Sequence, residues 1–192
     1  LQTFYSGMEG GAALARILFG DVSPSGKLPF TVAKDESDYP FFDKSADEIV
    51  YDRWHGYALM DKEDREPQFA FGHGLSYATF VYRALRVRRV QDGISVAVSI
   101  RNDGAIRADE IVQIYIRPPG KVAERSPRQL CGFERVTIEP AQTRTVHVHV
   151  RDQDFSFWHE ATSAWQIEPG LHVVEAGGSS ADSPGMSAGV EL

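Results

Sequence analysis

The stretch FAFGHGLSYATF, residues 69–80, decides how the chain is divided. Gly72 and Gly74 flank His73, and glycine adopts positive φ or approaches another backbone closely at little steric cost. Aromatic residues on both sides can pack against such a bend. We therefore expect a structural corner that closes one domain and opens the next. The imidazole of His73 is expected to hold this corner by hydrogen bonding; a ligand or proton-carrier role is the alternative.

After the corner, the hydrophobic period becomes that of β-strands. Ile94, Val96, Val98 and Ile100 alternate with small or polar residues, as expected for strands with one buried face. About seven short strands, separated by turns at this spacing, predict a β-sandwich of the immunoglobulin or fibronectin type. The expected strands cover residues 80–90, with one irregular step, and 94–100, 111–116, 129–138, 143–150 and 171–176, with short extended pieces at 155–158 and 165–167.

Before the corner, the pattern is mixed. Residues 11–19 place their apolar side chains on one helical face, and Gly20 stands where a helix commonly ends. Residues 1–5 could form a buried terminal strand, and residues 62–66 are expected to form a solvated turn. Residues 1–75 carry 13 acidic and 7 basic residues, net −6, whereas residues 76–192 carry 14 and 13, net −1. This shift supports a boundary at the corner.

Several motifs, in order along the chain, resemble those of glycoside hydrolase family 3, the β-glucosidase and β-xylosidase family. FAFGHGLSY resembles the family signature FPFGxGLSY. The others are YSGMEGGAALARILFGDVSPSGKLPF, YDRWHGYALMD, EIVQIYIRPP and RSPRQLCGFERVTIEP. Ser6 and Ala70 stand where the family usually has proline, and Ala141 where it usually has glycine. The resemblance covers nearly the whole chain.

The resemblance implies a mainly β fold: a fibronectin type III-like β-sandwich preceded by the terminal remnant of an α/β sandwich domain. Residues 1–75 would be the end of the α/β domain plus a linker, and residues 76–192 the sandwich. The parent enzyme would hydrolyse terminal non-reducing β-D-glucosyl residues with retention, which requires two carboxyl groups roughly 5–5.5 Å apart. In the family these lie in an N-terminal barrel and in the upstream α/β domain. No position here matches either motif, so no catalytic residue is expected in this chain.

The resemblance also implies partners: a β-glucoside or related oligosaccharide, and the barrel and α/β domains that would precede Leu1. The chain starts without an initiator Met or a signal-peptide pattern, and we expect a fragment or processed chain. The alternative is a non-catalytic carbohydrate-binding or adhesive β-sandwich, with residues 1–75 as a peripheral extension.

Composition excludes several function classes. The net charge of −7 and the pI of about 5.3 do not indicate a nucleic-acid partner. No apolar run approaches the ~18 residues of a membrane span. Cys131 is the single cysteine, so no intrachain disulfide can form, and the cellular compartment is left open. No cofactor or metal is expected.

Three residues are candidates for the rim of a sugar-binding cleft: Glu9, Asp52 and Trp54. Glu9 precedes the predicted helix, where a carboxylate is also favoured by the helix dipole, without any other role. Trp54 could stack on a sugar face, with Asp52 binding hydroxyl groups. The alternative places Trp54 and Tyr57 as anchors of a domain interface.

The remaining candidates favour structural roles. His147 and His149 share one strand face and could be two metal ligands, but a polar outer face opposite the valines is the simpler interpretation. Cys131 is expected to be a small buried apolar residue. Trp158 and Trp165 are expected to fill the end of the core. Two surface features are also predicted: a charged strand edge at Arg83, Arg86, Arg88 and Arg89, and a mobile tail or edge at residues 179–189.

Overall fold

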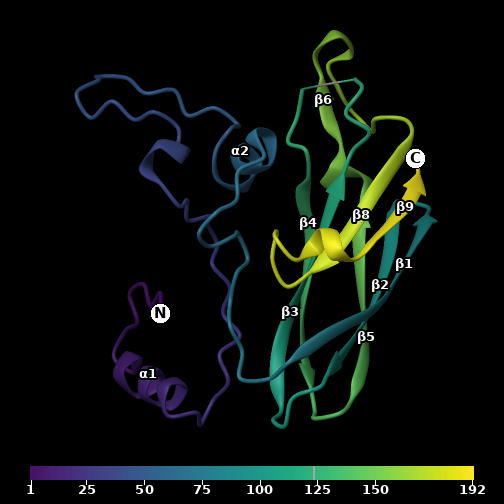
Figure 1. Cartoon of the computed structure of the whole chain (residues 1–192). Helices are drawn as coiled ribbons and strands as arrows, with labels where there is room; N and C mark the ends of the chain where they lie inside the picture. Colours follow the sequence, from purple (N-terminus) through teal and green to yellow (C-terminus); the bar gives the residue numbers. More distant parts are fainter. Residues whose placement is uncertain (123) are drawn as a thin grey trace.

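Two antiparallel sheets contain most of the strands of the molecule (Figure 1). The computed structural model describes residues 1–122 and 124–192. One sheet has the order β1-β2-β5 and the other β4-β3-β8-β9. Their bounds are β1 Phe80–Val90, β2 Gly93–Asn102, β5 Thr143–Arg151, β4 Gln129–Ile138, β3 Ala108–Arg117, β8 Leu171–Gly177 and β9 Ser187–Glu191. The predicted fibronectin-like sandwich is confirmed.

The core lies between the two sheets and follows the alternation in the sequence. Ile94, Val96, Val98 and Ile100 of β2 are all 0% exposed. They meet the buried valines and isoleucines of β5, β3 and β8, including Ile114 at 0% exposure. Burial of each such side chain contributes about 1.5–3 kcal/mol. This is the one large apolar cluster in the described part of the chain.

The outer surface of the β1-β2-β5 sheet is polar and charged, as predicted. The pairing of β1 with β2 shifts between Tyr82 and Ala84, which is the expected irregular step. The arginines of β1 lie on this sheet edge, where Arg83 Nη2 donates to Asp103 at 3.1 Å. On β5, His147 and His149 are exposed on the face opposite the core.

A small hairpin, β6 Phe157–His159 and β7 Ala164–Gln166, projects from the sandwich, with the short helices η2 Asp152–Phe155 and η3 Glu160–Thr162 beside it. Trp158 and Trp165 pair across this hairpin with ring centroids 5.7 Å apart. They are 50% and 61% exposed, so the prediction that they fill the core end is wrong. Phe155, at 1% exposure, occupies the core instead. A two-stranded hairpin has no second sheet to cover its outer face, and the tryptophans shield only each other.

The segment after β8 is an ordered turn, and only part of its prediction holds. Residues 187–191 form β9, an edge strand as expected. Ser179 and Ser180 are 2% and 3% exposed, however, which contradicts a mobile tail. Ser180 N donates to Phe71 O at 2.9 Å, and η4 Ser183–Gly185 closes the turn. Small polar residues allow this close packing, and their hydrogen bonds are satisfied internally.

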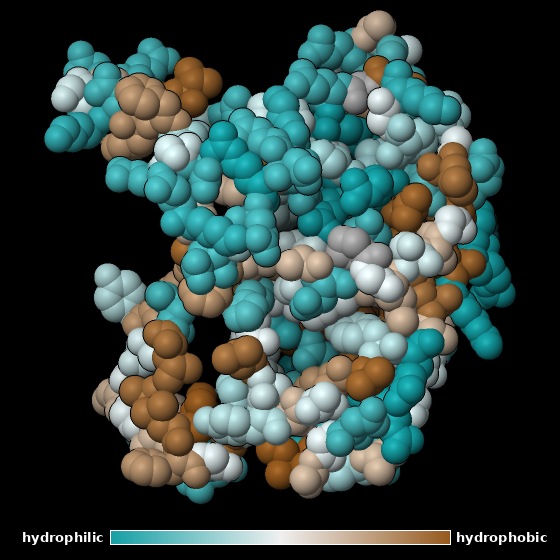
Figure 2. Space-filling model, viewed as in Figure 1, coloured by the Kyte–Doolittle hydropathy of each residue, from teal (hydrophilic) through white to brown (hydrophobic). Residues whose placement is uncertain are grey.

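Residues before the sandwich form helices α1 Gly10–Leu18, η1 Glu36–Asp38 and α2 Gly56–Glu63, joined by irregular chain. Gly20 has φ +85° just beyond α1, as predicted. Residues 1–5 are exposed and form no strand, so that prediction is wrong. Figure 2 shows brown, hydrophobic side chains gathered over α1 at the lower left, where Phe4, Met8 and Phe19 are 61%, 102% and 84% exposed. None of the described helices is long and apolar enough to cross a bilayer.

The corner packs backbone against backbone. Gly72 N donates to Leu28 O at 2.8 Å, and Leu28 N donates to His73 O at 2.9 Å. Gly72 has φ +79°, and a Cβ there would lie 2.7 Å from Cδ of Gln113. A larger residue would therefore require both a strained backbone and a shift of the Gln113 side chain. The imidazole of His73 packs against the Phe69 ring at 5.3 Å. Among the residues that the structure describes, the backbone of His73 makes the hydrogen bonds of the corner, and its imidazole makes none, contrary to expectation.

Candidate functional site

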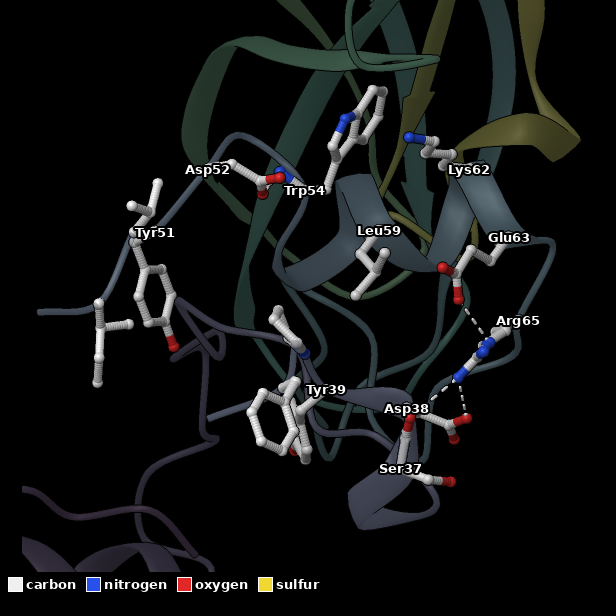
Figure 3. A pocket seen from close by; sticks show the side chains of 14 residues that line it. Ser37, Asp38, Tyr39, Tyr51, Asp52, Trp54, Leu59, Lys62, Glu63 and Arg65 are labelled. Carbon is white, nitrogen blue, oxygen red and sulfur yellow. Dashed lines mark hydrogen bonds and ion pairs between the residues drawn. The ribbon is translucent and has the colours of Figure 1, made fainter. Parts of the chain in front are cut away.

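A cavity of about 390 Å³ lies beside α2 (Figure 3). It is lined by residues 37–41 and 49–52, and by Trp54, Leu59, Lys62, Glu63 and Arg65. Its volume falls within the ~300–1,000 Å³ range of small-molecule sites. Aromatic rings and charged groups both face it, a combination suited to a polar ligand with an apolar face.

Arg65 forms the charged side of this cavity. Its Nη1 donates to Asp38 Oδ1 at 2.7 Å and to Ser37 O at 3.3 Å, while its Nε lies 2.8 Å from Glu63 Oε2. Figure 3 shows Arg65 between these two carboxylates. Asp64 adopts a left-handed conformation that ends α2 and brings the next residue back toward the cavity. Residues 62–66 are all exposed, as expected of a solvated segment, but Lys62 and Glu63 form the end of α2 and the segment also lines the cavity.

Trp54 forms the aromatic side. Its backbone N–H donates to Asp52 Oδ1 at 2.7 Å, which sets the turn that presents the indole. Lys62 Nζ lies 3.7 Å from the ring centroid, within the range of a cation–π contact. Figure 3 shows Lys62 on α2 beside the indole, and Tyr51 along the same segment as Asp52. One Asp52 oxygen is thus used to build the site.

Tyr39 contributes a third wall through an ordered loop. Ala33 N donates to its hydroxyl oxygen at 2.9 Å. The side chains of Asp35 and Asp38 cap η1 reciprocally, and the pKa of Asp35 is lowered by its hydrogen bonds from Ser37. The loop that bears Asp38 is therefore held by its own sequence as well as by Arg65.

The structure brings two of the three candidate site residues together. Asp52 and Trp54 both line the cavity. Glu9 stands at the N-terminus of α1, outside the residues that line it, and Figure 1 shows α1 and α2 well separated. Sequence reasoning missed Asp38 and Arg65. Their partnership spans 27 residues, and nothing in either local stretch indicates it.

Tyr57 is the interface anchor of the predicted Trp54–Tyr57 pair. Leu130 N donates to its hydroxyl oxygen at 3.1 Å, and its ring lies 5.2 Å from Phe71 and 6.0 Å from Tyr115. Burial raises the pKa of Tyr57, so its hydroxyl stays protonated. Trp54 faces the cavity, so the two aromatics of one motif serve different surfaces.

The other candidate side chains, Cys131 and the two histidines of β5, are in surroundings that favour structural roles. Burial raises the pKa of Cys131 to about 12, which keeps its thiol neutral beside the core. His149 Nε2 lies 3.5 Å from Asp92 Oδ1 on the outer sheet face. Within residues 1–122 and 124–192, no group of three or more His, Cys, Asp and Glu side chains could hold a metal ion.

Family profiles match both halves of the chain. Residues 1–77 match the Glycosyl hydrolase family 3 C-terminal domain, and residues 110–180 match the Fibronectin type III-like domain. This chain belongs to glycoside hydrolase family 3. It has the arrangement of the C-terminal portion of such a hydrolase, with its fibronectin type III-like domain.

The relatives to which this family 3 chain is similar in sequence include proteins named as β-glucosidases. It is 39% identical to a probable β-glucosidase J from Neosartorya fischeri, over 93% of this chain and 22% of that protein. It is 33% identical to β-glucosidase cel3A from Pyricularia oryzae, over 92% of this chain and 27% of the relative. The chain thus spans about a quarter of the length of these curated relatives.

Solved structures share the fold. A family 3 β-glucosidase from Bifidobacterium adolescentis superposes with a TM-score of 0.91 and 31% identity, covering 100% of this chain and 29% of that one. The β-D-glucoside glucohydrolase from Trichoderma reesei gives a TM-score of 0.90 and 30% identity, covering 96% and 29%.

Proposed function

We propose that this chain is the C-terminal structural portion of a β-glucosidase-like hydrolase and contains neither catalytic carboxyl group. The whole enzyme would hydrolyse terminal non-reducing β-D-glucosyl residues with retention. Residues 1–75 would complete an α/β domain, and residues 76–192 would brace it. The observation that carries the proposal is a set of buried polar ties across this boundary.

The strongest tie joins α2 to the sandwich. Arg128, only 7% exposed, donates from Nε and Nη2 to the two carboxylate oxygens of Asp61, both at 2.6 Å. Its Nη1 also donates to Ser183 Oγ at 3.2 Å. Burial would lower the pKa of Arg128, but Asp61 and Glu175 raise it above its usual value. A buried guanidinium whose three nitrogens all have partners fixes the position of α2 relative to the sandwich.

Further ties lie along the same boundary. Lys27 Nζ is 2.8 Å from Glu110 Oε1, with both side chains largely buried. Gln113 Nε2 donates to Gly72 O at 3.3 Å, which joins β3 directly to the corner. Together with Tyr57, these contacts support a brace and not a flexible linker.

The acids around the cavity are engaged in structure. Asp38 and Glu63 are both paired with Arg65, and Asp52 accepts the N–H of Trp54. A retaining glycosidase needs one free carboxylate as nucleophile and a second carboxyl group as acid/base. These contacts support the absence of a complete catalytic pair.

The test is turnover of an aryl β-glucoside by the purified 192-residue chain. We expect no release of the aryl group above the uncatalysed rate at any pH between about 4 and 8, where a catalytic carboxyl pair would act. Turnover that is abolished by Asp38→Asn or Asp52→Asn, but not by Glu139→Gln on the exposed surface, would overturn the proposal.

A second function, sugar binding without catalysis, is favoured by the cavity itself. Trp54, Tyr51 and Asp52 offer two rings and a hydroxyl-binding group. Glucose or cellobiose titrated against the chain should then change tryptophan fluorescence. Trp54→Ala should abolish that change, while Trp165→Ala, which removes an indole that is 61% exposed and lies outside the cavity, should preserve it. No change in the unaltered chain leaves the brace as the sole role.

A further inference from the structure

Three buried polar atoms in the β3–β4 loop and around the start of β8 lack a hydrogen-bond partner among the described residues. They are Arg125 Nη1, Glu168 Oε2 and His172 Nε2. Glu168 and His172 are both 0% exposed. Buried polar atoms are nearly always satisfied by protein or by ordered water, so three in one region require an explanation.

These residues belong to one neighbourhood. Arg125 Nη2 donates to Phe155 O at 3.0 Å, and the ring of Phe155 lies 6.0 Å from that of His172. Gly170, two residues from both Glu168 and His172, accepts a hydrogen bond from His172 at 3.1 Å. Arg125 and Glu168 both act electrostatically on His172.

The existing hydrogen bonds determine what each unpartnered atom can do. Gly170 O can only accept, so the proton of His172 is on Nδ1, and neutral Nε2 is an acceptor. Burial lowers the pKa of His172, which favours this neutral form. Glu168 Oε1 already accepts from the backbone N–H groups of Lys121 and Val122, which leaves Oε2 as a second acceptor. Arg125 Nη1 is a donor.

The donor Arg125 Nη1 and the acceptors Glu168 Oε2 and His172 Nε2 determine which ligand could bind all three atoms. It must accept one hydrogen bond, donate two, and be small enough for a buried site. A cation would meet the charge of Arg125, and an anion would meet that of Glu168, so a neutral molecule fits best. Water has this donor and acceptor set, and buried waters typically make about three hydrogen bonds.

We propose that Arg125, Glu168 and His172 form a binding site for a single buried water, which accepts from Arg125 and donates to the other two. This water joins the loop between β3 and β4 to the start of β8. Glu124, the neighbour of Arg125, accepts from Arg53 through its backbone O and lies 3.6 Å from Lys62 Nζ. The water therefore supports a loop that contacts the side of the cavity, whether or not that cavity binds sugar.

A high-resolution crystal structure of the full chain tests the site directly. We expect one ordered water within hydrogen-bonding distance, about 2.7–3.2 Å, of all three atoms. A direct ion pair between Arg125 and Glu168, or a protein atom in the water's place, would overturn the proposal.

Nuclear magnetic resonance gives an independent reading in solution. His172 should show the neutral tautomer protonated on Nδ1, and its ring protons should show magnetisation transfer from a long-lived water. Exposed His147 is the control in the same spectrum, because its hydration water exchanges too fast for such transfer. Equal behaviour of the two histidines would contradict a buried water at His172.

Discussion

The chain that precedes β1, residues 1–79, and the paired sheets that follow it differ in where their apolar side chains lie. The sandwich encloses isoleucines and valines at or near 0% exposure between two sheets. The earlier region exposes Phe4, Met8 and Phe19, and its buried hydrophobic residues are Ala33, Met60, Ala70 and Ala78. One region has a core of its own, whereas the other depends on contacts elsewhere.

The difference shows how a region without a core can still be ordered. Polar ties to the sandwich hold α2 and the corner, and these ties are buried and geometrically specific. The apolar face of α1 has no such tie, and exposed patches of this kind mark association surfaces. We propose that it packs against the rest of an α/β domain in the whole enzyme.

Hydrogen exchange should give the largest contrast between the two regions. We expect amides of α1 to exchange with almost no protection and those of β2 to exchange only through global unfolding, typically ~5–15 kcal/mol. Mass spectrometry of peptides after timed deuteration measures both. Full protection of α1 in a monomer would show that the helix needs no partner.

Removal of the buried arginine should detach α2 from the sandwich. Arg128→Met leaves the carboxylate of Asp61 without its buried partner, whereas Glu175 keeps Arg117 at 3.1 Å. Breaking such a buried pair costs about 3–5 kcal/mol. Urea unfolding monitored by circular dichroism measures the loss.

The matched control for Arg128 is Arg107→Met. Arg107 Nε lies 3.1 Å from Glu139 Oε1 in a pair that is 66% and 47% exposed. Such pairs contribute about 0–1 kcal/mol. Equal losses from both substitutions would mean that the tie across the boundary is no stronger than a surface pair.

Alanine at the corner tests packing separately from backbone strain. Gly72→Ala and Gly20→Ala both place a side chain at positive φ, at a cost of roughly 1–2 kcal/mol. A Cβ at Gly20 meets nothing within 4 Å, whereas one at Gly72 overlaps the Gln113 carboxamide. Thermal unfolding should therefore show the greater loss for Gly72→Ala. Equal losses of stability in the two variants would show that contact with Gln113 does not contribute to the cost of the Gly72 substitution.

Acid should weaken the sandwich slightly through His172. Its pKa is lowered in the folded protein by burial and by Arg125, with the hydrogen bond to Gly170 O and the charges of Glu168 and Glu191 opposing. The unfolded chain therefore takes up a proton first, near pH ~6.5, and stability present above that pH is lost as the pH falls toward the folded-state pKa. Denaturant midpoints across this range should lose part of their pH dependence in His172→Asn, which retains a donor for Gly170 O. His147→Asn should leave that dependence unchanged.

Prediction from sequence worked where local pattern alone decides structure. The alternation at residues 94–100 predicts a strand with one buried face, and the glycines at 72 and 74 predict a tight bend. The structure agrees with both predictions. It failed for Trp158 and Trp165, because a large apolar residue suggests burial while a projecting hairpin offers nothing to bury it. Sequence reasoning identified only part of the cavity. Asp52 and Trp54 were predicted because they are neighbours in the chain, whereas the pair of Arg65 with Asp38 was missed because it joins distant segments.

The sequence by itself determined the strands, the glycine corner and the family, since each depends on residues that are neighbours in the chain. Only the tertiary structure decided which charges meet, because Asp61 with Arg128 and Lys27 with Glu110 are separated by more than sixty residues. Periodicity sets which face of a strand is apolar; packing of distant segments sets which polar groups are enclosed and with what partner.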